Sequence, residues 1–468
     1  MTAQSVLSSF VFWSAWIIIP LIVEIIPSFV SIFVLARRRI RDRKAAPDPS
    51  LWPEVSVIVP VYNSERTLEA CLGSIDGGTY PTEQLRVFLV DNGSSDGSFE
   101  VFARCQDSLP SLRMQWLRAD QGKSKALNMA LYNTEAKYIV NIDSDGILDP
   151  KALTNLVRKF ENHPEVNCMT GAVLTDPSQV EETPTHGLHL LRRIEFVEYA
   201  QAFLAGRSYS SEINAIYTLS GAFSAFRKSA ILKSRMYTTD TVSEDTDLTF
   251  QMRYIQHERV AMCDDAIFLV SPISGMNELY TQRQRWQRGT LEVARLFPQS
   301  KLRLRRVFSD INVYTLVFDH TFAFPRLIWY VALLFLMAMN VSVRVILFSV
   351  LLIFALYVIE SYLYFVCALA LLRMDPPLRR YYLRQWWVVA LLPLYNTLVF
   401  FFRVAGIINS VDTSAAWHTR NLSEEWADFR RALRETLDSA KDAYWRAFGV
   451  FNDSAADKQA TQPKGDES

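Results

Sequence analysis

The fold of this chain is decided by the stretch Tyr138-Ile139-Val140-Asn141-Ile142-Asp143-Ser144-Asp145. Its first five residues are mostly β-branched or aromatic, which is typical of a buried strand. Two carboxylates follow directly, and side chains two residues apart in an extended segment point to the same side. The stretch therefore predicts a strand that ends in two acidic groups able to face one cation, although paired aspartates also occur in ordinary turns.

Strand and helix signals alternate around this stretch. Strand signals lie at residues 55–61 and 86–90, and helix signals lie at residues 65–74 and 124–132. Such alternation predicts an α/β fold with a mostly parallel sheet flanked by helices. Ligands bind at the carboxyl ends of the strands in such sheets, so the polar residues that follow each strand are candidates for a site.

Two polar segments occupy such positions. Asp91 begins the run Asp91-Asn92-Gly93-Ser94-Ser95-Asp96 and is placed like the acidic residue that holds a nucleoside in dinucleotide folds, but Asn-Gly also forms plain turns. The segment Gly122-Lys123-Ser124-Lys125 lacks the glycine that a phosphate loop needs five residues earlier, where Leu117 stands. Two lysines at a helix start suit phosphate, and they suit a solvated helix end equally well.

A further acidic segment, Ser243-Glu244-Asp245-Thr246-Asp247, lies about a hundred residues downstream. A carboxylate there is a suitable base for a sugar hydroxyl. The same pattern is also typical of a helix start with an N-cap and an acidic first turn, and the two interpretations are compatible.

The segment Gln282-Arg283-Gln284-Arg285-Trp286 stands just before the chain becomes membrane-like. On a helix, Gln282, Arg285, Trp286 and Gly289 share one stripe, because they are three, four and seven residues apart. Guanidinium binds phosphate oxygens, and indole offers a sugar ring an apolar platform. An interfacial membrane helix is the alternative, since Trp and Arg are common there too.

Composition limits the classes of function. The chain has 468 residues with 49 basic and 49 acidic side chains, which argues against a nucleic-acid partner. The five cysteines have no paired spacing and indicate buried thiols in a reducing compartment. The six histidines show no metal-ligand spacing.

Hydropathy predicts membrane helices at both ends of a soluble domain. Apolar runs lie at about residues 10–36, 321–339, 345–372 and 386–408, with Glu360 and Arg403 inside the last two. The basic block at residues 37–44 places the following domain in the cytoplasm by the positive-inside rule. We therefore expect a multi-pass protein of the cell membrane with its soluble domain inside.

Taken in order, these segments resemble an inverting family 2 glycosyltransferase of the GT-A type. The resemblance covers residues 52–288, and Gln-x-x-Arg-Trp is characteristic of membrane synthases for cellulose, chitin, hyaluronan and poly-N-acetylglucosamine. It implies a nucleotide-sugar-binding domain, a UDP-sugar donor, and Mg²⁺ or Mn²⁺ as cofactor. The matching segments are residues 57–63, 91–96, 123–128, 143–145, 220–222, 244–245 and 282–286.

The resemblance assigns five residues to the donor. Asp91 would contact the uridine, and Lys125 would lie near the nucleotide or its diphosphate. Asp143 and Asp145 would hold the diphosphate, with Asp145 as the metal ligand. Arg285 would neutralise the leaving diphosphate.

The resemblance assigns the remaining residues to catalysis and to the acceptor. Asp245 would be the catalytic base, with Glu244 beside it. Trp286 would stack on the acceptor sugar, and Gln282 would support that end. Direct displacement at the anomeric carbon would convert an α-linked donor into a β-linked product.

These interpretations divide the chain into an anchor at residues 1–44, a GT-A domain at 45–307, a C-terminal transmembrane region at 308–410 and a tail at 411–468. The tail contains Trp417-His418-Thr419-Arg420, which resembles the segment that closes over the donor in hyaluronan-type synthases. That segment is cytoplasmic, whereas counting crossings puts this tail outside, unless the run at 386–408 bends at Pro393 instead of crossing.

Two other functions stay open. A non-processive transferase that adds one sugar to a lipid-linked or glycan acceptor would share every donor residue. A non-catalytic membrane scaffold would not need the intact acidic and arginine residues. Membrane lipids are expected partners in each case, and accessory membrane proteins are possible ones.

Overall fold

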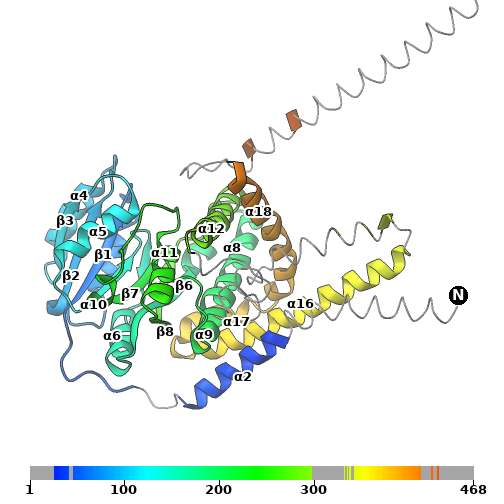
Figure 1. Cartoon of the computed structure of the whole chain (residues 1–468), viewed down its shortest axis with the longest axis horizontal. Helices are drawn as coiled ribbons and strands as arrows, with labels where there is room; N and C mark the ends of the chain where they lie inside the picture. The colour runs from blue at the N-terminus through cyan, green and yellow to red at the C-terminus, as the bar shows by residue number, and fades with distance from the viewer. Residues whose placement is uncertain are drawn as a thin grey trace, which may run out of the picture.

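The computed structural model describes residues 26–41, 46–297 and 342–412, together with isolated positions between 331 and 338 and between 423 and 431. An eight-stranded sheet in the order β3-β2-β1-β4-β7-β6-β8-β5 forms its centre (Figure 1). The strands are β1 Val55–Val61, β2 Leu85–Asp91, β3 Arg113–Arg118, β4 Tyr138–Ile142, β5 Gly146–Leu148, β6 Val166–Thr175, β7 Phe223–Arg227 and β8 Arg259–Val270.

The predicted α/β class is confirmed, and the sheet is mixed. Strands β3, β2, β1 and β4 run parallel to one another, and β6 runs parallel to β8. Strand β7 runs antiparallel to both β4 and β6, and β5 runs antiparallel to β8. The parallel half brings the carboxyl ends of β1, β2 and β4 to one edge, which is where the polar segments were expected.

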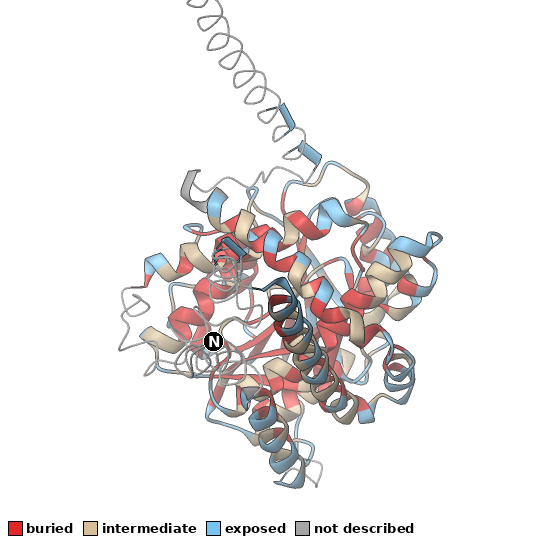
Figure 2. Cartoon of the chain, turned by 90° about the vertical axis from the view of Figure 1, so that its right-hand side faces the viewer, coloured by how far each residue is buried: buried red, intermediate tan, exposed pale blue. Residues whose placement is uncertain are grey.

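Burial explains which strands could be found from sequence. The predicted strands at 55–61 and 138–142 match β1 and β4, and every residue of both is buried. Strand β3, which lies partly exposed at the edge of the sheet, was not predicted, and neither were β5, β6, β7 and β8, although β6 is buried along almost its whole length. Figure 2 shows the buried residues concentrated in the centre of the molecule.

Helices cover both faces of the sheet in two layers. On one face pack α3 Leu68–Asp76, α4 Ser98–Ser108 and α6 Ala152–Asn162. On the other face pack α5 Lys123–Asn133 and α8 His186–Tyr199, and the hydrophobic cluster there continues into α16 Val343–Leu371, α17 Pro376–Arg384 and α18 Leu392–Asp412. The remaining described α-helices are α2 Ile26–Arg41, α7 Pro177–Glu181, α9 Arg207–Glu212, α10 Lys228–Ile231, α11 Glu244–Phe250 and α12 Met276–Leu296, and π-helical segments lie at Ala200–Gly206 and Gln251–Ile255.

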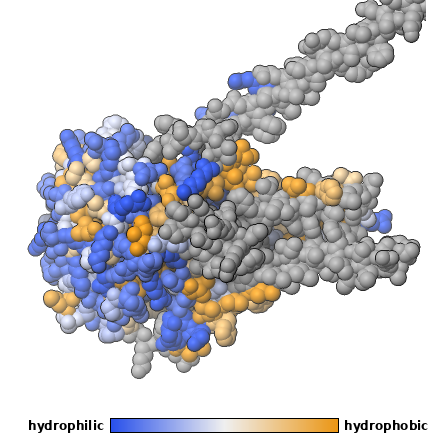
Figure 3. All heavy atoms as spheres, viewed as in Figure 1, coloured by the Kyte–Doolittle hydropathy of each residue, from blue (hydrophilic) through white to orange (hydrophobic). Residues whose placement is uncertain are grey.

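Two described helical segments, Ile346–Met374 and Val388–Ile408, are long and apolar enough to cross a membrane. They agree with the predicted runs at 345–372 and 386–408. Leu347, Phe348 and Leu351 of α16 are exposed apolar side chains, as expected for a lipid-facing surface. Figure 3 shows mostly hydrophilic residues on the surface of the sheet domain and hydrophobic residues on the side where α2, α16 and α18 lie.

The last apolar run is interrupted near the expected position. A tight 3₁₀ turn, Val388–Leu391, precedes α18, and Pro393 lies in the first turn of that helix, where proline is tolerated. The predicted spans at 10–36 and 321–339 lie mostly outside the described residues, as does the segment at 417–420.

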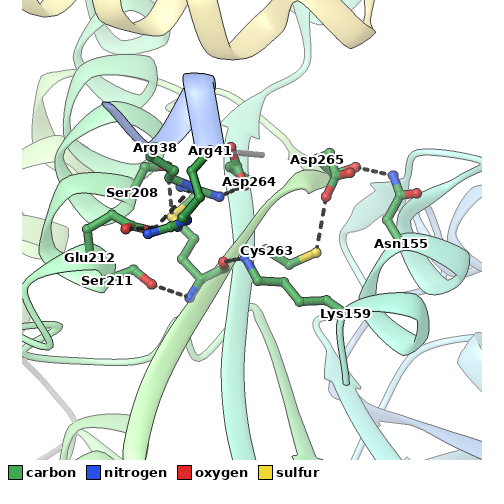
Figure 4. A network of polar contacts seen from close by, with 11 residues as sticks. Arg38, Arg41, Asn155, Lys159, Ser208, Ser211, Glu212, Cys263, Asp264 and Asp265 are labelled. Atoms are coloured by element: carbon green, nitrogen blue, oxygen red, sulfur yellow. Dashed lines mark hydrogen bonds and ion pairs between the residues drawn. The ribbon is translucent and has the colours of Figure 1, made fainter. Parts of the chain in front are cut away.

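An ion-pair cluster fastens α2 to the sheet domain (Figure 4). The Arg38 guanidinium donates to Asp264 on β8 at 2.6 Å and lies 3.3 Å from Glu212 on α9. Burial on its own would raise the pKa of Asp264, but Arg38 and Lys159 outweigh it and lower that pKa. The stabilisation is therefore present above the ordinary aspartate pKa and is lost as the pH falls through the lower folded value.

Replacing Arg38 by methionine should lower the thermal midpoint of the protein in detergent. Breaking a buried pair from one side costs on the order of 3–5 kcal/mol, and we expect the lower end because the Arg38 and Asp264 side chains are 12% and 20% exposed. The deficit should narrow as the pH falls below the ordinary aspartate pKa of about 4 and through the lower pKa of folded Asp264, where the carboxylate of the unaltered protein protonates. Glu135→Gln, which breaks a pair at an 87% exposed carboxylate, is the control and should change little. An equal fall in the thermal midpoint of both variants would contradict the inference that the Arg38–Asp264 pair stabilises the fold.

Candidate functional site

A cavity of about 780 Å³, called the main cavity below, opens at the edge where the parallel strands end. Four carboxylates from two distant segments face it: Asp143 and Asp145 after β4, and Glu244 and Asp245 at the start of α11. The first segment is joined to the loop before β7, since the amide of Asp143 donates to the carbonyl of Ala222 at 3.2 Å. The second segment is joined to the same loop, because the amide of Gly221 donates to Asp245, so the β4–β7 pairing and this loop bring the predicted acidic residues together.

Lys123 lies among these carboxylates as a half-buried cation. Its ammonium donates to Asp143 Oδ1 and to the carbonyl of Gly221 at 3.3 Å, and it lies 3.8 Å from the Glu244 carboxylate. Burial on its own would lower the pKa of Lys123, but Asp143 and Glu244 outweigh it and raise that pKa above its ordinary value. The ammonium therefore stays charged and offsets the repulsion between the carboxylates.

Asp245 is oriented by the backbone around it. Its Oδ2 accepts from the amide of Gly221 at 2.9 Å, and its Oδ1 accepts from the amide of Thr246 at 2.7 Å. A Cβ at position 221 would lie 3.1 Å from Asp245 Oδ2, so glycine lets the carboxylate approach the backbone closely. The Asp245 carboxylate is consequently held in one place at the cavity wall.

The charge of the main cavity favours an additional cation. Burial raises the pKa of Glu244, and Asp245 adds to the rise while Lys123 opposes it. Asp145 is open to the cavity, but the surrounding protein displaces enough water to raise its pKa, and Asp143 adds to the effect. Lys123 pairs with Asp143, and within the described residues no basic side chain lies within ion-pair distance of Asp145.

Helix α12 forms another wall of the cavity. Gln282, Arg285 and Trp286 all line it, which confirms that they share one stripe of a helix. Gly289, on the same stripe, does not line it. Its Cα faces Ser243, the residue just before α11, and a Cβ at position 289 would overlap the Ser243 hydroxyl. The lack of a side chain at Gly289 therefore lets α12 pack directly against the start of α11, the helix that carries Asp245.

Asp91 and Lys125 lie elsewhere, since neither is among the residues that line the main cavity. Asp91 ends β2, and its Oδ1 accepts from the amide of Ser94 at 2.9 Å, which closes the turn that its sequence also favoured. The Lys125 side chain is 49% exposed and lies 3.7 Å from Asp120. Of the two lysines at the start of α5, Lys123 is the one that enters the cavity.

Sequence reasoning missed several residues of the cavity besides the role of Lys123. Tyr199 and Phe203 flank Trp286, with ring centroids 6.5 and 5.7 Å from it. The sequence signal nearest to Lys123 was the glycine that precedes it. Gly122 stands directly before α5, and its φ of 133° is readily adopted only by glycine. No comparable signal marks Tyr199 and Phe203.

The main cavity continues from the carboxylates to the apolar helices. Its far end is lined by Ser28 of α2, Glu360 of α16, and Asn396 and Arg403 of α18. Ser28 donates to Glu360 at 2.8 Å. Glu360 and Arg403 are the two ionisable residues noticed inside the apolar runs, and both face this polar space.

Comparison with known proteins agrees with this architecture. Residues 56–233 match the family model described as "Glycosyl transferase family 2". Poly-beta-1,6-N-acetyl-D-glucosamine synthase of Staphylococcus aureus (strain COL) is 25% identical over 292 residues, which cover 60% of this chain and 64% of that protein. The same enzyme of Staphylococcus epidermidis is 25% identical over 269 residues, covering 57% and 60%. This chain therefore spans somewhat under two thirds of the curated relatives it matches.

A solved structure is similar in fold. A mannosyltransferase from Pyrobaculum calidifontis, in complex with GDP-Man and Mn²⁺, matches with a TM-score of 0.51 and 21% sequence identity. The match covers 79% of this chain and 96% of that chain. The predicted GT-A type of α/β fold is confirmed at this level.

Gly289→Ala should destabilise the protein by separating α12 from α11. Overpacking of this kind typically costs about 1–3 kcal/mol, because the new methyl group meets Ser243. Thermal unfolding in detergent should show a lower midpoint, which Ser243→Gly in the same chain should partly restore. Gly73→Ala, at a helical glycine with open space around its Cα, is the matched control and should be neutral or stabilising. Failure of Ser243→Gly to restore any stability would argue against this contact.

Proposed function

We propose that this chain, whose residues 56–233 match the family 2 glycosyltransferase model, is a membrane-bound inverting glycosyltransferase that transfers a sugar from a UDP-sugar to a growing β-linked glycan. The observation that carries the proposal is the main cavity, where Asp245, Arg285 and Trp286 share one space with the acidic end of β4. The similarity to poly-beta-1,6-N-acetyl-D-glucosamine synthases supports N-acetylglucosamine as the first sugar to test.

In the proposed reaction, Asp245 acts as general base. Its carboxylate takes the proton of an acceptor hydroxyl while that oxygen bonds to the anomeric carbon and the bond from that carbon to the diphosphate oxygen breaks. The backbone amides of Gly221 and Thr246 hold the carboxylate in position for this step. Attack from the face opposite the diphosphate inverts an α-linked donor to a β-linked product, and Glu244 lies beside the base.

Arg285 and Lys123 are placed to stabilise the departing diphosphate. Arg285 is exposed toward the cavity, and Lys123 at the start of α5 reaches Asp143 just after β4. Both cations can therefore stabilise the negative charge that develops on the leaving oxygens. We retain Asp143 as a residue near the diphosphate. Asp91 and Lys125 remain proposed contacts of the uridine and the nucleotide at the strand ends beside the cavity.

Divalent metal belongs to the proposal through Asp145. Within the described residues no group of three or more His, Cys, Asp and Glu is arranged to hold a metal, so diphosphate oxygens and water would complete the ligands. The raised pKa of Asp145, caused first by its surroundings and then by Asp143, fits a carboxylate that receives a cation. Mg²⁺ or Mn²⁺ would supply charge neutralisation for the leaving diphosphate.

We propose that the acceptor lies on the α12 side of the cavity. The Trp286 indole and the Gln282 amide face that space, and the cavity leads from them to polar residues on α16 and α18. An aromatic platform beside a polar passage suits a glycan, and the apolar helices would equally admit a lipid-linked acceptor. The single-transfer alternative therefore shares this geometry, and product length decides between the two.

The proposed setting is the cell membrane. Residues 1–44 would anchor the chain, 45–307 would form the cytoplasmic catalytic domain, 308–410 would return to the membrane, and 411–468 would be a tail. The two described apolar helices support this, as do exposed arginines on α17 between them, such as Arg379, Arg380 and Arg384. Lipids and accessory membrane proteins are the expected partners.

Incubating purified membranes with labelled UDP-GlcNAc, UDP-glucose and GDP-mannose tests the proposal. UDP-GlcNAc should be incorporated into a β-linked product, and Asp245→Asn should lower the rate on the order of 10²–10⁴-fold while UDP binding persists. Asp240→Asn, the same change at an exposed residue of the preceding loop, should behave like the unaltered protein. Absence of transfer from every donor by folded protein would overturn the proposal.

Chelation tests the metal. Adding EDTA should stop transfer, and adding back Mg²⁺ or Mn²⁺ should restore it. Asp145→Asn should raise the metal concentration needed for half-maximal activity, and it should weaken Mn²⁺ binding measured by electron paramagnetic resonance. Full activity in chelator, with no metal found by elemental analysis, would exclude a metal-dependent site.

A further inference from the structure

Arg283 differs from its neighbours in the segment 282–286. Gln282, Arg285 and Trp286 line the main cavity, whereas Arg283 does not, and its side chain is only 3% exposed. A buried guanidinium is costly unless it is paired and hydrogen-bonded. The contacts that compensate for this cost indicate what Arg283 does.

Those contacts join three helices. Arg283 Nη2 donates to Glu198 Oε2 on α8 at 2.6 Å and to the Tyr395 hydroxyl oxygen on α18 at 3.3 Å. The Tyr395 hydroxyl in turn donates to the same Glu198 oxygen at 3.0 Å. The three side chains form a closed buried triangle, so none of them can shift without breaking two of its bonds.

The same guanidinium lies against the proposed acceptor platform. Its central carbon is 4.4 Å from the centroid of the Trp286 ring, a distance at which cation and aromatic ring attract each other. Phe203 contacts the indole edge-on, with centroids 5.7 Å apart and planes at 72°. Trp286 is half-buried, and the surface left open faces the cavity. Arg283 and Phe203, with Tyr199 at a centroid distance of 6.5 Å, therefore surround the indole and hold it in one orientation.

We propose that Arg283 is a positioning residue for the acceptor. Paired with Glu198 and Tyr395, it holds the Trp286 indole at the angle needed for a sugar ring to stack, and it couples that angle to the membrane helix α18. The inference rests on the proposed function, because it needs an acceptor sugar at Trp286. Arg283 itself touches neither donor nor acceptor.

A merely structural ion pair would behave differently. Loss of such a pair would reduce folded protein, and with it acceptor elongation and donor hydrolysis by water in equal proportion. Loss of a positioning residue should instead lower elongation more than hydrolysis and raise the KM for the acceptor while leaving the KM for the donor nearly unchanged. The ratio of elongation to hydrolysis, measured on folded protein in detergent, separates the two.

The decisive variant is Arg283→Lys, which keeps the charge near Glu198 but loses the planar group that stacks on the indole. The ratio of elongation to hydrolysis should fall roughly tenfold. In a Trp286→Ala background, where the ratio is already low, Arg283→Lys should cause no further fall, because Arg283 acts through that ring. Tyr395→Phe, which keeps the aromatic ring and removes only the hydroxyl, should lower the ratio by less.

Arg38→Lys is the matched control, since it makes the same change at a buried ion pair on α2. It should leave the ratio unchanged. An unchanged ratio in Arg283→Lys, or an equal fall with and without Trp286, would overturn the inference while the proposed function stands. If the unaltered folded protein transfers no sugar from any donor, the proposed function fails and the inference falls with it.

Discussion

The site depends on the charge balance around the Lys123 ammonium. Four carboxylates from segments a hundred residues apart face one cavity, and their mutual repulsion would force them apart without a cation between them. Lys123 meets Asp143 directly, is close to Glu244, and reaches the carbonyl of Gly221. One side chain thereby ties the end of β4 to the loop before β7 and to the start of α11. Within the described residues no basic side chain lies at ion-pair distance from Asp145, and this supports the proposal that a divalent metal binds there.

Helix α12 packs against both this cluster and the apolar helices. On one side Gly289 brings it against Ser243, at the start of the helix that carries Asp245. On another side Gly406 of α18 brings that helix close to the backbone of Gln284, with a Cβ at position 406 only 3.0 Å from the Gln284 Cα. Between these two approaches, Arg283 is paired with Glu198 and Tyr395. The helix that carries Arg285 and Trp286 is thus held both at the start of α11 and at α18.

This arrangement separates chemistry from support along one short segment. Residues 282, 285 and 286 face the cavity, and residues 283 and 284 are buried against the neighbouring helices. The buried guanidinium packs against the half-buried indole, and under the proposed function a ring held in this way would lower the entropic cost of stacking a sugar on it. The membrane-like helices are therefore part of the site, because they supply Tyr395 and the polar far wall.

The sequence by itself determined the parts that depend on local pattern. Buried apolar runs marked β1 and β4 to the residue, and the helical period marked the cavity stripe of α12. The order of the motifs carried the resemblance to family 2 glycosyltransferases and marked the acidic residues that meet at the cavity. Only the tertiary structure decided the rest. The edge strand β3 is not buried in a regular pattern. Lys123 and Lys125 lie two residues apart on α5, and only the packing decides that Lys123 points into the cavity. Likewise, Gly289 contacts Ser243 and Arg283 contacts Tyr395, and in both cases the two residues are far apart in the sequence. Local sequence carries no record of such partners, because they are selected by the way whole helices pack.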